Sequence, residues 1–277
     1  MKNTLFLGAF GFLFAISCKN NPVGPEKEIA TTTADTERLI WSDEFDGDTL
    51  DRTHWDFETG DGGWGNNEWQ NYTAGDNVSV SDGMLHITAK KVGEGQQVGD
   101  YTSTRLVSIP KFKYGRIEIR AKMPDHKGNG IWPALWMLGE DIGQVGWPLC
   151  GEIDIMEYVS YDPNHVIQTI HATANNHMDG TQISTGELPL ETMEEAFHNY
   201  GILWSENVLK FYIDIPDNIT LTIPKPEIPT AENWPFDKPY FFILNIAVGG
   251  NWGGLKGVDD SIFPATMDVD YVRVYEF

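Results

Sequence analysis

Apolar and polar residues alternate with a period of two along several short segments of the chain. The pattern is clear in MLHITAK (84–90), RIEIRAK (116–122) and VLKFYID (208–214), and Gly, Pro, Asn and Asp separate these segments. A period of two places every second side chain on the same face, so each segment predicts a half-buried β-strand. The best helix candidate, residues 190–197, is short and equally compatible with a loop. Strands without intervening helices predict an all-β fold, either an antiparallel sandwich or a barrel.

Composition and charge narrow the class of protein. The chain has 277 residues, with 41 acidic side chains against 19 Lys and Arg and a formal net charge of −22. Nucleic-acid binding depends on Lys and Arg that neutralise phosphates, so we expect no nucleic-acid partner. Hydrophobic residues make up 41% of the chain, enough for a sizeable core. The 28 Gly and 15 Pro would interrupt long helices and favour short strands in one large domain.

The N-terminal segment has the features of an export signal. Lys2 precedes an apolar run over residues 5–16, which is too short for a stable transmembrane helix. Residues 15–18, Ala-Ile-Ser-Cys, resemble a bacterial lipobox, in which the Cys is lipidated after cleavage. The alternative is an ordinary signal peptide that contains a Cys. We expect residues 1–17 to be a lipoprotein signal peptide, and the protein to be an exported bacterial lipoprotein whose only membrane contact is a lipid anchor at Cys18.

The next segment has the composition of a flexible tether. Residues 18–38 are rich in Pro, Thr, Glu and Lys and show no hydrophobic period. We therefore expect the folded domain to cover residues 39–277. If Cys18 is acylated, Cys150 has no partner, and the mature domain contains no intramolecular disulfide. The sequence leaves open whether the anchored protein faces the periplasm or the cell surface.

Three acids lie close together in the segment GEIDIMEY (151–158). Glu152 and Asp154 share one face of a predicted strand. Glu157 is five residues after Glu152, so strict alternation would turn it to the opposite, buried face. A β-bulge at Ile155-Met156 would add one residue to the strand and return Glu157 to the face of the other two acids.

Crowded carboxyls are costly unless their pKa values separate, because like charges keep one partner protonated. One ionised and one protonated carboxyl on either side of a sugar linkage is the arrangement that glycoside hydrolysis requires. Two other interpretations fit the same pattern, an acidic edge strand that deters aggregation and a cation site built from three acids.

The order of several motifs resembles glycoside hydrolase family 16, in particular its laminarinase-like branch of endo-β-1,3-glucanases and β-1,3(4)-glucanases. The resemblance covers residues 40–277 and rests on WSDEF (41–45), GWGNNEWQNYT (63–73), YGRIEIRAKMP (114–124), WPALWMLG (132–139), GEIDIME (151–157), NIAVGGNW (245–252) and VDYVRVYE (269–276). It implies a β-jelly-roll sandwich of two antiparallel sheets with a concave substrate cleft, and a retaining mechanism.

The resemblance also implies roles for the three acids. Glu152 matches the nucleophile, Glu157 the general acid/base, and Asp154 the residue that holds and tunes the nucleophile. The extra residue Met156 occurs in the laminarinase, agarase and carrageenase branches, whereas lichenase-type and xyloglucan-cleaving branches have the shorter spacing. The segments 132–139 and 247–252 are similar to those of β-glucanases, which favours a gluco-configured substrate.

Further residues match substrate-binding positions of the family. Trp132 and Trp136 are four residues apart, so a strand points both rings to the same face, where they could stack on sugars or simply belong to the core. Trp252 lies in a Gly-rich loop. His171 matches a histidine near the acid/base on a neighbouring strand, with a hydrogen-bonded core histidine as the alternative. Asn67 and Arg105 match residues of the negative subsites, or are a turn residue and a surface charge.

A structural calcium is a further implication of the resemblance. Glu44, the carbonyl of Gly83 and Asp270 match calcium-binding positions, and oxygen ligands suit this ion. The alternative is a salt-bridged pair of chain termini. We expect no cofactor in catalysis. The segment GDGGWG (60–65) formally fits a dinucleotide-binding motif, but no predicted strand and helix flank it.

Together these observations predict a monomeric, retaining endo-β-glucanase. Its partner would be a β-glucan polysaccharide, either β-1,3-glucan (laminarin) or mixed-linkage β-1,3-1,4-glucan. Two alternatives are a non-catalytic β-1,3-glucan-binding protein and a galactanase of the agarase or carrageenase type with the same fold.

Overall fold

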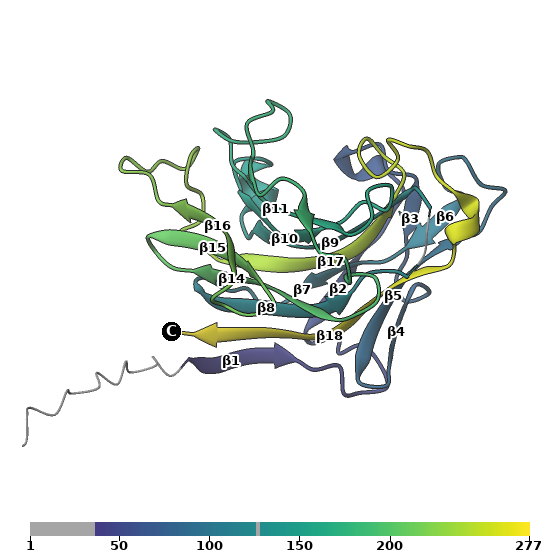
Figure 1. Ribbon diagram of the computed structural model, residues 1–277, viewed down its shortest axis with the longest axis horizontal. Coiled ribbons are helices and arrows are strands. Elements are labelled where there is room, and N and C mark those ends of the chain that lie inside the picture. Colours follow the sequence, from purple (N-terminus) through teal and green to yellow (C-terminus); the bar gives the residue numbers. More distant parts are fainter. Residues whose placement is uncertain (1–36, 126–127) are drawn as a thin grey trace, which may run out of the picture. The chain divides into compact units, whose positions relative to one another are not determined.

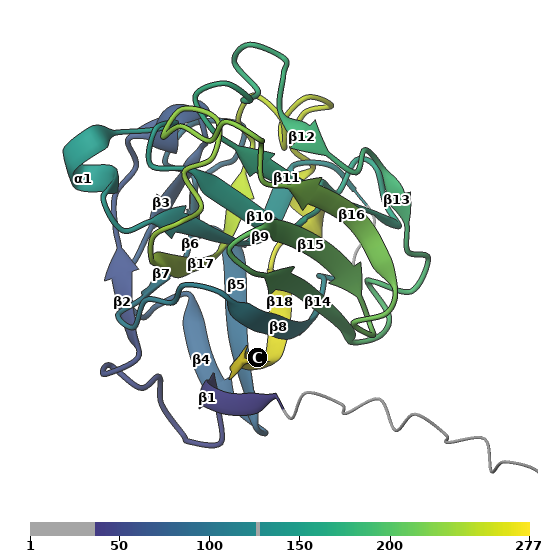
Figure 2. The same ribbon diagram turned by 90° about the vertical axis from the view of Figure 1, so that its left-hand side faces the viewer.

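Two β-sheets lie face to face in the computed structural model, which describes residues 37–125 and 128–277 (Figures 1 and 2). The predicted signal peptide and Cys18 lie outside the described residues, as does almost all of the predicted tether. Among the described residues the first strand is β1 (Arg38–Asp43), which includes residue 39, where the folded domain is predicted to start. The fold is therefore the predicted all-β sandwich, a jelly roll.

Ten strands form the first sheet. Its main path runs in the order β16-β15-β14-β8-β18-β5-β6-β3, with β1 paired to β18 and β4 paired to β5. The strands other than β1 are β3 (Gln70–Tyr72), β4 (Val78–Ser81), β5 (Met84–Lys91), β6 (Tyr101–Ser103), β8 (Gly115–Lys122), β14 (His198–Trp204), β15 (Val208–Ile213), β16 (Ile219–Pro224) and β18 (Ala265–Glu276).

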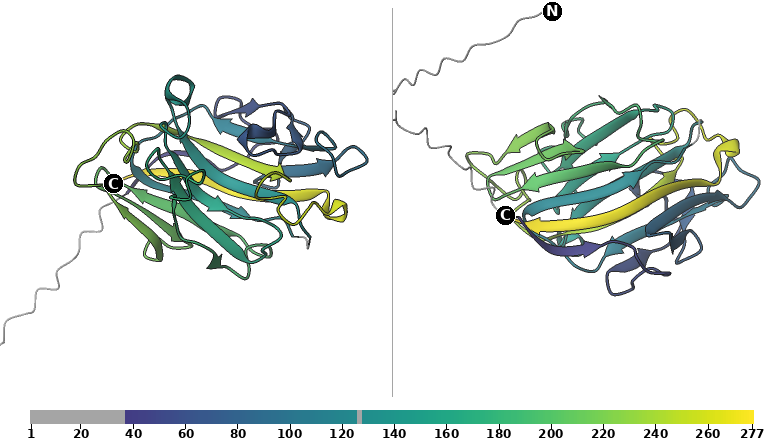
Figure 3. Two further views of the ribbon diagram at one scale, coloured as in Figure 1. Left: turned by 90° about the horizontal axis from the view of Figure 1, so that it is seen from above. Right: turned by 60° about the horizontal axis from the view of Figure 1, so that its bottom comes forward.

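Eight strands form the second sheet, which carries the candidate site. Its main path runs in the order β12-β11-β10-β9-β17-β7-β2, and β13 pairs with β11. The strands are β2 (Trp55–Glu58), β7 (Arg105–Ser108), β9 (Ile131–Gly139), β10 (Glu152–Glu157), β11 (His165–His171), β12 (Ile183–Ser184), β13 (Leu188–Pro189) and β17 (Tyr240–Val248). Figure 3 shows this sheet from above and the ten-stranded sheet from below.

The core fills the space between the sheets. Period-two alternation explains it, since Leu85, Ile87 and Ala89 of β5 are fully buried while their neighbours are not. The predicted strands at 84–90, 116–122 and 208–214 are confirmed as β5, β8 and β15. Burying this apolar surface stabilises the domain by roughly 25 cal/mol for each Å² removed from water.

Helical structure is confined to short connections. The described residues contain one α-helix, α1 (Ile142–Val145), and two 3-10 helices, η1 (Gly63–Gly65) and η2 (Asp260–Ile262). Residues 190–197, equally compatible with a helix and a loop, form turns before β14, so the loop alternative is confirmed. A segment of this length does not offset the cost of helix nucleation. No helix among the described residues is long and apolar enough to span a membrane. Cys150 is buried and unbridged.

Candidate active site

Strand β10 carries the three acids, and its register is irregular at the predicted point. Against β9, Asp154 pairs with Trp136 but Met156 pairs with Leu135, so two steps along β10 match one step along β9. The pairing of β10 with β11 shifts over the same residues. This is a β-bulge at Ile155-Met156, and it confirms the prediction made from the odd spacing of the acids.

The bulge sorts the side chains of β10 between two faces. Ile153, Ile155 and Met156 are fully buried in the core. Glu152, Asp154 and Glu157 line a cleft of about 1010 Å³ on the other face of the sheet. Two adjacent residues, Ile155 and Met156, can both point inward only because the strand bulges there.

Each outer acid accepts a hydrogen bond from an indole. The Nε1 of Trp132 donates to Oε1 of Glu157 at 3.2 Å, and the Nε1 of Trp147 donates to Oε2 of Glu152 at 2.9 Å. One oxygen of each carboxyl is thereby held by an indole N–H. Trp147 lies five residues before Glu152 and was not predicted, although its place next to the acidic segment is the sequence signal that could have identified it.

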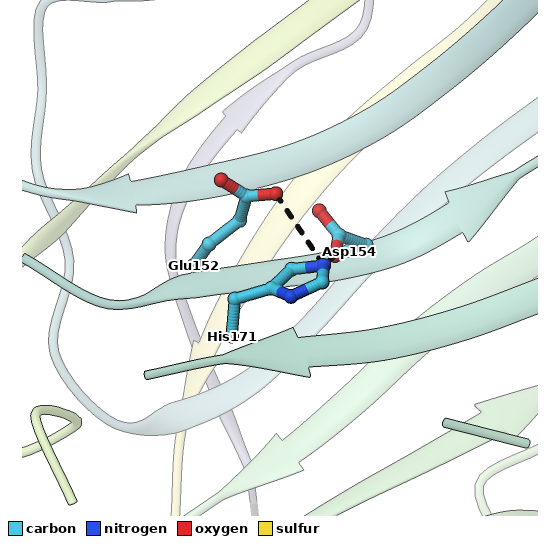
Figure 4. Close-up of side chains that lie close together, drawn as sticks. All are labelled: Glu152, Asp154 and His171. Carbon is cyan, nitrogen blue, oxygen red and sulfur yellow. Dashed lines mark ion pairs between the residues drawn. The ribbon is translucent and has the colours of Figure 1, made fainter. Parts of the chain in front are cut away.

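His171 lies on β11 directly across from Glu152, with which it forms a cross-strand pair. Its Nε2 atom is 3.3 Å from Asp154 and 3.8 Å from Glu152 (Figure 4). The resemblance places this histidine near the acid/base on a neighbouring strand; it lies on that strand and its charge acts on Glu157, but its ion-pair contacts are with the other two acids. The oxygens of Glu152 and Asp154 and a ring nitrogen of His171 lie within 4.8 Å of one another, so this group also has the geometry to hold a cation.

Burial dominates the electrostatics of the three carboxyls. It raises the pKa of Glu152 to about 8, and the neighbouring Asp154 adds to this rise. Burial followed by the charge of Asp154 raises the pKa of Glu157 well above its usual range, and burial raises the pKa of Asp154 too. Burial and mutual repulsion therefore keep the three groups from being ionised together near neutral pH, so the cluster holds protonated carboxyls there.

Aromatic and polar residues continue the cleft over β9, β17 and β7. Trp132 and Trp136 both line it, which confirms that their rings share a face. The guanidinium of Arg105 lies 4.6 Å from the ring centre of Trp136 and 5.0 Å from that of Trp64, so it is held between two indoles. The Nε of Arg105 also donates to Glu58.

A Gly-rich loop closes this part of the rim. Trp252 lines the cleft and meets Trp132 edge-on, with ring centres 5.1 Å apart. The side chain of Asn67 is exposed and donates to Asn251, which lines the cleft. Asn67 thus lies at the rim, next to the cleft wall.

The opposite wall, over β11 and the loop after it, has residues that no motif predicted. The ring of His177 lies tilted against Trp147, with ring centres 5.0 Å apart, and meets His171 edge-on at 5.3 Å. Met178 lines the same wall and is 76% exposed. The loop has no periodic pattern, so only the folded chain brings these residues to the site.

The two carboxylates among the predicted calcium ligands have cationic partners. Glu44 accepts from Arg273 with both carboxylate oxygens, at 2.9 and 2.7 Å, and Asp270 accepts from Arg120 at 2.6 Å. A calcium ion would have to displace Arg273 to reach Glu44, and it would share Asp270 with Arg120. These contacts favour the alternative of salt-bridged chain termini, and calcium binding by Glu44, the Gly83 carbonyl and Asp270 stays a prediction.

Comparisons with known proteins agree with this geometry. The model of the family "Glycosyl hydrolases family 16" matches residues 65–273. A beta-glucanase of Rhodothermus marinus is 44% identical over 250 residues, which cover 86% of this chain and 85% of the relative. The crystal structure of a laminarinase from Flavobacterium sp. UMI-01 is 45% identical, with a TM-score of 0.77, and the match covers 86% of this chain and all of that one.

A third similar protein has a broader activity in its description. SCLam, a non-specific endo-beta-1,3(4)-glucanase, is 38% identical with a TM-score of 0.78, and the match covers 87% of this chain and 91% of that one.

Proposed function

The chain belongs to glycosyl hydrolase family 16, and from this we propose that it is a retaining endo-β-1,3(4)-glucanase that cuts internal linkages of a β-1,3-glucan or a mixed-linkage β-1,3-1,4-glucan. The observation that carries the proposal is the bulge of β10, which brings Glu152, Asp154 and Glu157 to one face of a cleft lined by aromatic rings.

In the first step Glu157 is the general acid and Glu152 the nucleophile. The protonated carboxyl of Glu157 gives its proton to the glycosidic oxygen as the bond from that oxygen to the anomeric carbon breaks. An oxygen of ionised Glu152 forms a bond to the same carbon, so a glycosyl-enzyme ester results. The indole N–H of Trp147 holds the other oxygen of Glu152 and favours its ionised form.

In the second step Glu157 is the general base. Its carboxylate removes a proton from water, the water oxygen attacks the anomeric carbon, and Glu152 leaves as a carboxylate. Two inversions at one carbon give net retention. Asp154 lies beside both Glu152 and His171 and shares a hydrogen bond with Glu152, so it can accept the proton that Glu152 must lose before attack.

The charge of the cleft favours a neutral polysaccharide. Glu68 and Glu187 line it in addition to the three acids of β10, whereas Arg105 is the only Lys or Arg among the lining residues of the described chain. A sulfated galactan would be repelled by those of these carboxyls that are ionised, with only the Arg105 guanidinium in the described lining to offset them. The acidic lining therefore favours the glucanase over a carrageenase-type galactanase.

Hydrolysis assays test this proposal and separate its alternatives. Purified protein is incubated with laminarin, mixed-linkage glucan, agarose and carrageenan, and new reducing ends are measured. We expect activity on the glucans, none for Glu152→Gln, and a β-anomer as the first product by NMR. Glucan binding without hydrolysis would support the non-catalytic binding protein, and an α-anomer would overturn the retaining mechanism.

We also propose that the enzyme is exported and held on a membrane by a lipid at Cys18, and that it acts as a monomer. The support is the lipobox-like sequence at residues 15–18 followed by a polar, period-free segment. Membrane fractionation of wild type and Cys18→Ala tests the anchor. Wild type should enter the membrane fraction and the variant the soluble one, and mass spectrometry showing an unmodified N-terminus after Cys18 would refute the anchor. Light scattering of the domain gives its oligomeric state.

A further inference from the structure

A buried glutamine contacts the catalytic bulge from behind. Gln168 of β11 is fully buried and points to the core face between Val166 and Ile170, while its neighbours Ile167 and Thr169 line the cleft. Its Nε2 donates to the backbone carbonyl of Ile155 at 2.9 Å. Ile155 is the bulge residue that the pairing with β9 skips, and the Gln168 amide gives its buried carbonyl a hydrogen-bond partner.

The other end of the same amide reaches the opposite sheet. Oε1 of Gln168 accepts from the hydroxyl of Thr220 in β16. The pairing of β16 with β15 shifts around Thr220, since Leu221 pairs with Phe211 and Ile219 with Tyr212. Thr220 thus occupies the irregular position of a second bulge. One amide links a bulge in the eight-stranded sheet to a bulge in the ten-stranded sheet.

The chemistry of these groups sets the direction of both bonds. A peptide carbonyl only accepts, so the NH₂ of Gln168 must face Ile155 and its oxygen must face the hydroxyl. An apolar side chain would fill the same core position without needing any partner. A fully buried amide that meets a partner at both ends has a structural task at this point.

We propose that Gln168 and Thr220 are positioning residues for Glu157, an inference that rests on the acid/base role proposed above. Glu157 follows the bulge directly, and only the bulged register turns it to the cleft. The Thr220–Gln168 link fixes the Ile155 peptide to the opposite sheet and so resists a slip of β10 into regular alternation. Loss of the link displaces the general acid while Glu152 and Asp154, before the bulge, stay in place.

The test compares two substrates that differ in their need for an acid. Hydrolysis of a glucan requires protonation of the leaving sugar, whereas a dinitrophenyl glycoside has a leaving group that departs without it. For Gln168→Met we expect kcat on glucan to fall by about 10- to 100-fold, the range for a misplacement near 1 Å. The rate of the first step with the dinitrophenyl glycoside should stay within about threefold of wild type.

Two further variants separate loss of the Thr220–Gln168 link from a general change in core packing. Thr220→Val removes one hydroxyl and preserves shape, so it should lower kcat on glucan in the same selective way but less. Ile170→Val trims the core beside Gln168 without touching the link, and both substrates should be hydrolysed as by wild type. If Gln168→Met folds poorly, the comparison of Thr220→Val with Ile170→Val shows whether the link positions Glu157.

The outcomes separate this inference from the proposed function. Equal losses on both substrates, or a lower melting temperature with unchanged kcat on glucan, would show that Gln168 is merely structural. In either case Glu157→Ala would still be selectively inactive on glucan. If Glu157→Ala itself hydrolysed glucan at the wild-type rate, the acid/base role would fail, independently of Gln168.

Discussion

Deletion of Met156 tests whether the number of residues in β10 places the general acid. The deletion joins Ile155 to Glu157 and gives an even spacing between the two catalytic acids. A regular strand could then keep both on the cleft face without a bulge. Glu157 would nevertheless move along the strand by up to one residue, about 3.3 Å.

Two magnitudes follow from the structure. Met156 is fully buried, and the loss of such a side chain costs roughly 2 to 5 kcal/mol of the free energy of unfolding. Domains are stable by about 5 to 15 kcal/mol, so we expect the variant to fold, with a melting temperature lower by about 4 to 20 °C. A displacement of even about 1 Å can cost about 100-fold in rate, so kcat on glucan should fall by at least about 100-fold.

Met156→Ala is the matched control, because it removes the same buried side chain and keeps the residue count. Its melting temperature should fall by a similar amount, while its kcat stays within about threefold of wild type. Thermal unfolding by circular dichroism gives stability, and laminarin hydrolysis is measured well below each melting temperature. Near wild-type kcat for the deletion would refute the importance of the bulge. An equal loss of kcat in Met156→Ala would show that packing, and not spacing, places Glu157.

Three other measurements probe the site. Trp147→Phe keeps an aromatic ring but removes the indole N–H that favours ionised Glu152. The acidic limb of the kcat/KM profile should therefore move to higher pH, and kcat should fall by about 10-fold. An acidic limb at the wild-type pH would contradict this role of Trp147. Glu152→Gln should raise the melting temperature, by about 2 to 8 °C, more at pH 9 than at pH 4. Burial raises the folded-state pKa of Glu152 from 4.5 to about 8. The stability that protonated Glu152 contributes is complete below pH 4.5 and is lost as the pH rises to about 8. A difference in melting temperature between wild type and Glu152→Gln that does not change with pH would argue against the burial effect. EDTA should leave the activity unchanged. Added calcium should leave the melting temperature unchanged if the Arg273–Glu44 and Arg120–Asp270 ion pairs stay intact. A rise in melting temperature of several degrees would support the structural calcium site.

Local sequence patterns were enough to predict several strands of this fold. Period-two alternation in residues 84–90, 116–122 and 208–214 was enough to predict β5, β8 and β15, because a strand's two faces depend only on neighbours along the chain. The odd spacing of Glu152 and Glu157 predicted the bulge for the same reason. The family motifs added the cleft position of the tryptophans.

The partners of several site residues depend on contacts between segments that are distant in the sequence, so they are known only from the folded chain. The pairing of β10 with β11 sets His171 against Glu152 and Asp154, and no spacing in the sequence specifies that partner. The same holds for the pairing of Glu44 with Arg273. Gln168 looks like an ordinary strand residue until β16 brings Thr220 to its amide. A hydrogen bond or pKa shift arises from the atoms that packing places within a few ångströms, and residues 52 or 229 positions apart carry no local sign that they will meet.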